Sequence, residues 1–242
     1  MAARPSRQRM LITGATSGIG NALVSRLTPK GDILAMGRRA EDDARAVLPA
    51  GVTYKAADQT DPEAAANLTL TALDELGWDG LDAAVLNAGT GWAGDPGQET
   101  SARIRATLDA NLTATIMLAH ALFPRLEKRK GHLVLVGSVA RKGAGAFASY
   151  AASKAGLHGF GRALAAEWRG RVTVQTIHPG PTATGMHTRA GYDTGRAARL
   201  FLSADAVAAM IEDIMGSSAP HANASYGRFV LAKVMPWRGA RR

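Results

Sequence analysis

The chain has 242 residues, 46% of them hydrophobic and 20% charged, which is the composition of an ordinary globular protein. It has no cysteine, which excludes disulfides, thiolate zinc sites and a cysteine nucleophile. The formal net charge of +9 is concentrated at the two ends, since residues 1–9 and 233–242 carry basic but no acidic residues, so we expect no nucleic-acid partner. The sequence has neither a secretory signal nor an apolar run of membrane-spanning length, so we expect a cytoplasmic protein without membrane contact.

Short apolar segments alternate along the chain with longer amphipathic ones. Segments with strand character, rich in Val, Leu and Ile, lie at 9–13, 32–36, 52–56, 81–86, 132–136, 172–177 and 228–232. Segments with helical character lie at 19–29, 41–47, 62–76, 100–128, 150–168 and 203–215. This alternation predicts an α/β fold with one doubly wound domain over residues 9–232, flanked by basic tails at 1–8 and 233–242. The segment 181–202 has no clear period and is expected to be a loop over a site.

The first predicted strand leads into TGATSGIG, residues 13–20, and a predicted helix follows. Three glycines, Gly14, Gly18 and Gly20, would let the backbone approach a pyrophosphate, and the helix N-terminus would offer free N–H groups to it. The spacing is GxxxGxG rather than the GxGxxG of the standard dinucleotide fingerprint. The sequence therefore predicts a dinucleotide-binding turn, and the alternative is a tight turn that binds nothing.

Tyr150 and Lys154 stand four residues apart in YAASK, within a predicted helix, so they would share one helix face. A free tyrosine titrates near pH 10, and a fixed ammonium nearby stabilises the phenolate. We therefore expect Lys154 to lower the pKa of Tyr150 and so to prepare it for proton transfer. The pair is weak evidence when taken alone, because a chain with four tyrosines can contain such a pair by chance.

Further segments, taken with these two, resemble in order the motifs of classical short-chain dehydrogenases/reductases. They are LNAG at 86–89, Asn111 in DANLTAT, Ser138 in VLVGSVA and HPGPTATGM at 178–186. Leu86 replaces the first asparagine of the family's NNAG element. The resemblance covers about residues 9–232 and implies a single Rossmann-type domain with a seven-stranded parallel sheet and helices on both faces.

The resemblance implies a catalytic set of Asn111, Ser138, Tyr150 and Lys154. Tyr150 would be the acid in reduction and the base in oxidation, and Ser138 would hydrogen-bond the substrate oxygen. In the family the lysine also holds the nicotinamide ribose, and the asparagine positions a water that connects the lysine to solvent. The helices predicted at 100–128 and 150–168 form the family's subunit interface, which implies a homodimer or homotetramer.

The end of the second predicted strand bears on the choice of cofactor. Gly37 stands where an acidic residue usually selects NAD, and Arg38 and Arg39 follow it. Because a guanidinium suits the 2′-phosphate, we predict NADP(H), and the alternative is two solvated surface arginines. By resemblance, Asp58 lies near the adenine ring and Thr184 contacts the nicotinamide carboxamide. The residues expected to bind the cofactor are Gly14, Thr16, Ser17, Gly18, Ile19, Gly20, Arg38, Arg39, Asp58, Asn87, Ala88, Gly89, Tyr150, Lys154, Pro179, Gly180, Thr182 and Thr184.

The substrate pocket is expected outside the carboxyl ends of the strands. Its candidate residues are Trp92, Ser138, Phe147, Met186, His187 and Tyr192, a mixture that suggests a partly apolar carbonyl compound. The histidines have no metal-ligand spacing such as HExxH, so no metal is expected.

These features predict an NADP-dependent oxidoreductase that transfers a hydride between NADP(H) and a small carbonyl or secondary alcohol, as a carbonyl reductase or alcohol dehydrogenase does. Two alternatives stay open. One is a non-catalytic NADP(H)-binding redox sensor, which need not keep Ser138, Tyr150 and Lys154. The other is an epimerase or dehydratase acting on a sugar nucleotide, for which the short part of the chain after residue 178 leaves little room.

Overall fold

The computed structural model describes residues 7–186, 190, 191, 195, 199, 201–217 and 221–224. Its main strands are β1 (Gln8–Thr13), β2 (Gly31–Gly37), β3 (Thr53–Ala56), β4 (Ala83–Leu86), β5 (His132–Val136), β6 (Thr173–Pro179) and β9 (His221–Ala224). They form a parallel sheet in the order β3-β2-β1-β4-β5-β6-β9. Two short strands, β7 (Thr182–Ala183) and β8 (Leu202–Ser203), pair with each other outside this sheet.

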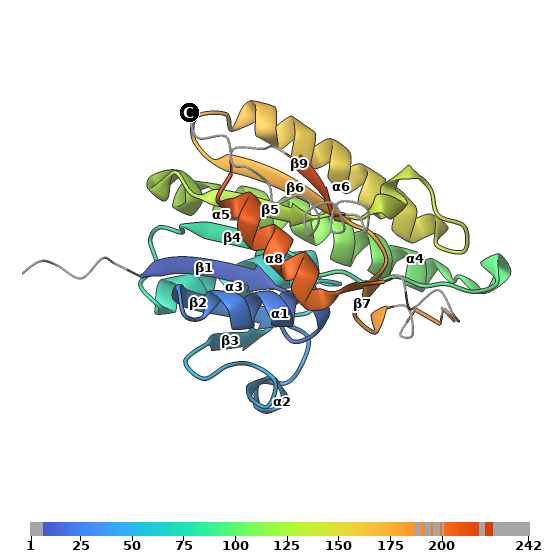
Figure 1. Ribbon diagram of the computed structural model, residues 1–242, viewed down its shortest axis with the longest axis horizontal. Coiled ribbons are helices and arrows are strands. Elements are labelled where there is room, and N and C mark those ends of the chain that lie inside the picture. The colour runs from blue at the N-terminus through green and yellow to red at the C-terminus, as the bar shows by residue number, and fades with distance from the viewer. Residues whose placement is uncertain are drawn as a thin grey trace, which may run out of the picture.

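Helices cover both faces of the sheet (Figure 1). On one face, α1 (Gly18–Leu27) packs against α8 (Ala204–Met215). The other face carries α3 (Pro62–Glu75), α5 (Ala114–Arg129) and α6 (Ala148–Glu167), with α4 (Ser101–Leu108) against α6. The shorter elements are α2 (Glu41–Arg45), the 3₁₀ turns η1 (Pro96–Gln98) and η3 (Val139–Lys142), and the π-helical turn η2 (Asp109–Thr113). Within the described part of the chain, no helix combines the length and the apolar character needed to cross a membrane.

The strands are apolar because both of their faces are buried. In β1, Met10 and Ile12 belong to the core cluster under α1 and α8, whereas Leu11 belongs to the cluster under α3, α5 and α6. Successive strand side chains point to opposite faces, so a strand covered on both sides needs a continuous apolar run. The prediction of a Rossmann-type α/β fold with a parallel sheet is thereby confirmed.

Two element predictions need correction, and a third lies outside the described residues. The described strand at this edge of the sheet is His221–Ala224, whereas the predicted strand 228–232 lies outside the described residues. The predicted helix 100–128 is interrupted, since a π-helical turn at Asp109–Thr113 separates α4 from α5. Strand β1 begins at Gln8, inside the predicted N-terminal tail, and the side chain of Arg7 contacts Asp32 at 2.7 Å.

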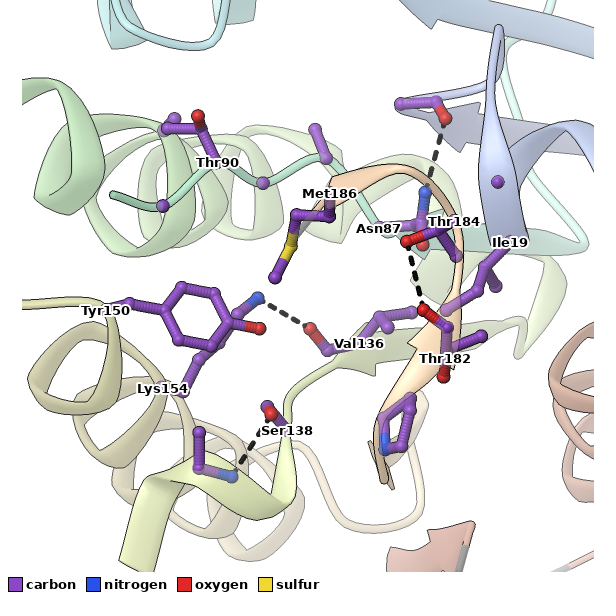
Figure 2. A pocket seen from close by; sticks show the side chains of 18 of the residues that line it. Ile19, Asn87, Thr90, Val136, Ser138, Tyr150, Lys154, Thr182, Thr184 and Met186 are labelled. Atoms are coloured by element: carbon purple, nitrogen blue, oxygen red, sulfur yellow. Dashed lines mark hydrogen bonds between the residues drawn. The ribbon is translucent and has the colours of Figure 1, made fainter. Parts of the chain in front are cut away.

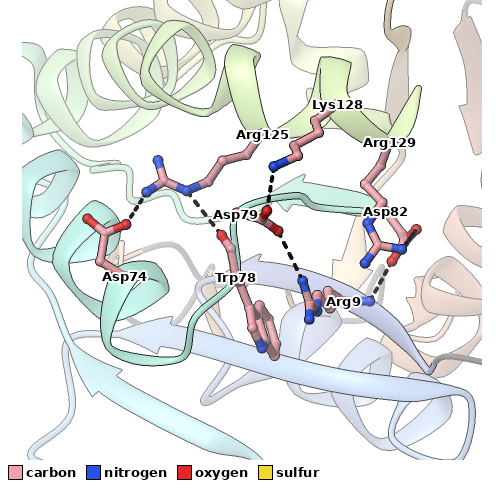
Figure 3. A network of polar contacts seen from close by, with 8 residues as sticks. All are labelled: Arg9, Asp74, Trp78, Asp79, Asp82, Arg125, Lys128 and Arg129. Atoms are coloured by element: carbon pink, nitrogen blue, oxygen red, sulfur yellow. Dashed lines mark hydrogen bonds and ion pairs between the residues drawn. The ribbon is translucent and has the colours of Figure 1, made fainter.

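A network of polar contacts ties the amino ends of β1 and β4 to the end of α5 (Figure 3). Asp79 pairs with Lys128 and, at 3.4 Å, with Arg9, while Asp82 accepts from the Arg9 backbone N–H at 2.8 Å and lies 3.7 Å from Arg129. The Lys128 ammonium lowers the pKa of Asp79. Exposed ion pairs of this kind each contribute little to stability, because water and salt screen them. Their position keeps these charges at the edge of the sheet opposite the cavity described next.

Candidate active site

A cavity of about 1130 Å³ lies at the carboxyl ends of the strands, the edge at which open α/β sheets bind ligands. Most of the residues predicted to bind the cofactor line it: Gly14, Thr16, Ser17, Gly18, Ile19, Arg38, Arg39, Asp58, Asn87, Ala88, Gly89, Tyr150, Lys154, Pro179, Gly180, Thr182 and Thr184. Three of the predicted substrate residues, Ser138, Phe147 and Met186, line it as well. Among the lining residues that were not predicted, Val136 lies within the quoted segment VLVGSVA, whereas Thr90, Gly91 and Phe201 belong to none of the quoted motifs.

Three predicted residues do not line the cavity, and two more cannot be placed because they lie outside the described residues. Gly20 packs beneath the first turn, where a Cβ would lie 2.1 Å from the Gly14 carbonyl oxygen. Trp92 does not line the cavity, and the Arg103 guanidinium lies 5.4 Å from the centre of its ring. Asn111 is fully buried behind the lining. His187 and Tyr192 lie outside the described residues.

The turn between β1 and α1 is shaped by glycines. Gly14 has a φ of +65° and Gly18 a φ of +53°, which glycine adopts without the strain that a side chain would bring. Ser17 precedes α1 without a side-chain capping bond, and the first turn of the helix has no acidic residue. The first N–H groups of α1 therefore border the cavity with no neighbouring carboxylate from this turn, which favours an anion there.

Asn87 fixes this turn to the end of β4. Its Nδ2 donates to the carbonyl oxygens of Thr13 and Gly14, at 3.1 and 3.3 Å. The Thr13 hydroxyl accepts in return from the backbone N–H groups of Asn87 and Ala88, both at 3.0 Å. Asn87 thus joins the turn after β1 to the end of β4, and it can stabilise the cavity in this way without contacting a ligand.

Tyr150, Lys154 and Ser138 converge on one space in the cavity (Figure 2). Tyr150 and Lys154 project from α6 and are 8% and 3% exposed. Lys154 Nζ donates to the Val136 carbonyl oxygen at 2.9 Å and lies 5.8 Å from the centre of the Tyr150 ring. Ser138, two residues after Val136, accepts from the Ala140 N–H at 3.1 Å through Oγ. The three side chains therefore come from the end of β5 and from one turn of α6.

Burial sets the pKa values of this pair. It raises the pKa of Tyr150, an effect that a hydrogen bond with Ser138 partly offsets. It lowers the pKa of Lys154 to about 8. The expectation that Lys154 lowers the pKa of Tyr150 is wrong here, because both groups lose hydration and the ammonium is directed at the Val136 carbonyl. Tyr150 is consequently protonated at neutral pH and available as a proton donor.

Asn111 lies in the π-helical turn η2, a type of turn that is frequent at functional sites. Its Oδ1 accepts from the Thr90 N–H at 2.8 Å, and its Nδ2 donates to the Thr90 carbonyl at 2.8 Å and to Ser153 Oγ at 2.9 Å. Ser153 in turn donates to the Tyr150 carbonyl at 2.7 Å. The side-chain amide of Asn111 therefore connects Thr90 at the cavity wall to α6. Both N–H groups of its Nδ2 are used in these bonds, so neither is left to donate to the water that we expected Asn111 to position.

The remaining polar groups give no sign of a metal centre. Among the residues that the structure describes, no three His, Asp or Glu side chains gather closely enough to hold an ion. The cavity brings together a buried phenol, an ammonium and a hydroxyl beside a glycine-rich helix start.

Comparison with known proteins agrees with this arrangement. The family model described as short chain dehydrogenase matches residues 8–194. An uncharacterized oxidoreductase of Myxococcus xanthus is 37% identical over 190 residues, which are 74% of this chain and 73% of that protein. A 1-deoxy-11-beta-hydroxypentalenate dehydrogenase of Streptomyces exfoliatus is 36% identical over 223 residues, 86% of this chain and 79% of that protein.

A short chain dehydrogenase from Burkholderia cenocepacia, solved in complex with NADP, is 29% identical with a TM-score of 0.76, covering 93% of this chain and all of that one. Its agreement over nearly the whole chain means that the likeness extends beyond the nucleotide-binding half. With the family model spanning most of its length as well, the chain belongs to the short-chain dehydrogenase/reductase family of oxidoreductases.

Proposed function

We propose that the protein is an NADP(H)-dependent oxidoreductase that transfers a hydride between the cofactor and a carbonyl or secondary alcohol. One observation carries this proposal. Tyr150, Lys154 and Ser138 meet in a cavity that also contains a glycine-rich helix start and the two arginines Arg38 and Arg39. A proton donor and an anion-binding surface in one cavity are what a carbonyl reduction by a phosphorylated dinucleotide needs.

The cavity residues fit such a dinucleotide. A Cβ at Gly14 would lie 2.9 Å from Ala88 Cα, and one at Gly89 would lie 2.9 Å from Asn111 Oδ1, so both positions accept only glycine without displacement. Arg38 and Arg39 are exposed, and neither forms an ion pair with another described residue, which leaves both guanidiniums available to a 2′-phosphate. The NADP in the Burkholderia structure supports the same choice of cofactor.

The bound cofactor would supply the hydride in reduction and accept it in oxidation. Tyr150 would give its proton to the substrate oxygen in the first direction and take it back in the second. Its raised pKa keeps Tyr150 protonated at neutral pH, and Lys154, with a pKa of about 8, is mostly protonated there and supplies a positive charge beside the cavity. The Ser138 hydroxyl accepts from Ala140 and is hydrogen-bonded to Tyr150, and it would turn its O–H from Tyr150 to the substrate oxygen when substrate binds.

The part of the cavity beside Tyr150 favours an apolar substrate. Gly91, Phe147, Met186 and Phe201 line the cavity, and a Cβ at Gly91 would lie 3.1 Å from the Tyr150 ring. The Streptomyces relative is named as the dehydrogenase of a hydroxy compound, which suits a secondary alcohol. A small ketone or secondary alcohol with an apolar body is therefore the proposed substrate class.

The homo-oligomer and the cytoplasmic location stay predictions.

The test is NADPH consumption measured across a panel of ketones, aldehydes and diketones, with NADH as the cofactor control. We expect turnover that prefers NADPH, and a loss of about 10²- to 10⁴-fold in kcat in Tyr150→Phe while NADPH still binds. Tight binding without turnover on a broad panel would favour the redox sensor instead. A preference for NADH would contradict the assignment made from Arg38 and Arg39.

A further inference from the structure

Tyr54 makes a contact that links two neighbouring strands just outside the cavity. It lies in β3 opposite Ala35 of β2, and its ring packs on the core cluster under α1 and α8. Its hydroxyl extends past the end of β2 and donates to the Arg39 carbonyl oxygen at 2.9 Å. Tyr54 does not line the cavity, so any effect on a ligand has to pass through the segment that it holds.

Residues 38–40, the segment that follows β2, form few other hydrogen bonds to the rest of the described protein. The end of β2 is anchored by the hydrogen bonds from Ala15 N to Met36 O, at 3.0 Å, and from Ala57 N to Gly37 O, at 2.7 Å. Beyond Gly37, the Tyr54 hydroxyl makes the one hydrogen bond, among the described residues, that reaches residues 38–40 from outside the local chain. Both guanidiniums of this segment are exposed.

Tyr54 also limits what can stand at the end of β2. A Cβ added to Gly37 would lie 3.2 Å from both Tyr54 Oη and Thr16 Oγ1, which is tighter than ordinary packing. An acidic side chain at this position, which would hold the ribose hydroxyls of NAD, would therefore require both hydroxyls to shift by a few tenths of an ångström. The Tyr54 hydroxyl, which holds the Arg39 carbonyl, thus also crowds position 37, where an acidic residue would select NAD.

We propose that Tyr54 is a positioning residue that selects for the 2′-phosphate of NADP(H), because it holds the Arg38–Arg39 segment in place and crowds an acidic residue at position 37. This inference rests on the proposed use of NADP(H). It goes beyond it by assigning part of the selectivity to a phenol on the neighbouring strand that touches no ligand. Burial and the Glu41 carboxylate raise the pKa of Tyr54, so the hydroxyl remains a donor over the working pH range.

The experiment compares the binding of 2′,5′-ADP and 5′-AMP to wild type and Tyr54→Phe by calorimetry. The two ligands differ by the 2′-phosphate alone. We expect the Kd for 2′,5′-ADP to rise by about three- to tenfold, the loss of one hydrogen bond, with the Kd for 5′-AMP unchanged. The matched control is Thr28→Val, which removes a hydroxyl–carbonyl bond of 2.7 Å to Val24 at the far end of α1 and should change neither Kd.

A double substitution, Arg38→Ala with Arg39→Ala, shows whether the effect passes through the arginines. On that background Tyr54→Phe should produce no further loss of 2′,5′-ADP affinity, because the groups that it positions are gone. Equal weakening of both ligands, or of neither, in Tyr54→Phe would overturn the inference while leaving the cofactor assignment in place. A wild type that binds 5′-AMP as tightly as 2′,5′-ADP would overturn the NADP(H) assignment and this inference together.

Discussion

Replacing Lys154 with methionine is expected to change how the stability of the protein depends on pH. The ammonium is almost fully buried, and burial lowers its pKa from 10.5 to about 8 in the folded protein. Methionine has a similar length and no charge, so it removes the titration while largely keeping the volume. It also removes the donor to the Val136 carbonyl, a loss that affects stability at every pH alike.

The direction follows from the two pKa values. Between pH 8 and 10.5 the unfolded chain binds more protons than the folded one, so the stability of the wild type rises with pH. Below pH 8 the folded state carries the full penalty of the buried charge, about 3 kcal/mol. From pH 7 to pH 9.5, the linkage relation gives a gain of about 2 kcal/mol in the wild type relative to Lys154→Met.

The assay is urea unfolding of both proteins at pH 7 and pH 9.5, at one protein concentration so that any oligomer contributes equally. Tyr150 and the surface groups are common to both proteins, so their titrations cancel in the difference to a first approximation. The expected result is a difference in unfolding free energy that shifts by about 2 kcal/mol in favour of the wild type. A difference that stays constant between the two pH values would refute the lowered pKa of Lys154.

Three other substitutions test separate parts of the site. Asn111→Ala removes three side-chain hydrogen bonds and should lower the unfolding free energy by about 3 kcal/mol, measured by urea unfolding. Gly18→Ala places a Cβ 2.8 Å from Thr184 Cβ at a φ of +53°, and should weaken NADPH binding about tenfold or more in calorimetry. Gly37→Asp alone should fail to give an NADH preference in KM ratios, whereas adding Tyr54→Phe should bring the ratio closer to one, because one of the two crowding hydroxyls, that of Tyr54, is gone.

The fold could be predicted where residue type alone decides the structure. The run RMLIT predicts a strand buried on both faces, and β1 alternates its side chains between two cores. The strand at His221–Ala224 could not be predicted, because the letters HANA carry little strand propensity. It becomes a strand through parallel pairing of its backbone with Thr176–Pro179 at the sheet edge. The π-helical turn could not be predicted from helical periodicity either. It accompanies the contact of Asn111 with Thr90, two residues that are far apart in the sequence.

The residues that line the cavity could be predicted where short-range spacing along the chain places them. The residues of the glycine-rich turn and of YxxxK lie within a few positions of one another, so their relative placement follows from local structure alone. Trp92 was misplaced because an aromatic residue after a strand can face either a ligand or a neighbour, and here it meets Arg103, eleven positions on. The predicted direction of the Tyr150 pKa shift was wrong for a related reason. The pKa is raised by burial, and burial depends on the elements that surround α6, which local spacing does not reveal.

The positions of Ser138 and Lys154 relative to each other depend on strand register more than on side-chain packing. Lys154 is held by the carbonyl of Val136, the last residue of β5, and Ser138 follows two positions later. Val136 pairs with Ile177 of β6, and the next residue, Gly137, donates to the Ile177 carbonyl at 2.8 Å. A Cβ at Gly137 would lie 2.4 Å from His178 Nδ1, so only glycine lets the chain leave the sheet at this point. The parallel β5–β6 register therefore fixes where the serine and the lysine meet, which explains how three side chains from two elements reach one space with so few contacts of their own.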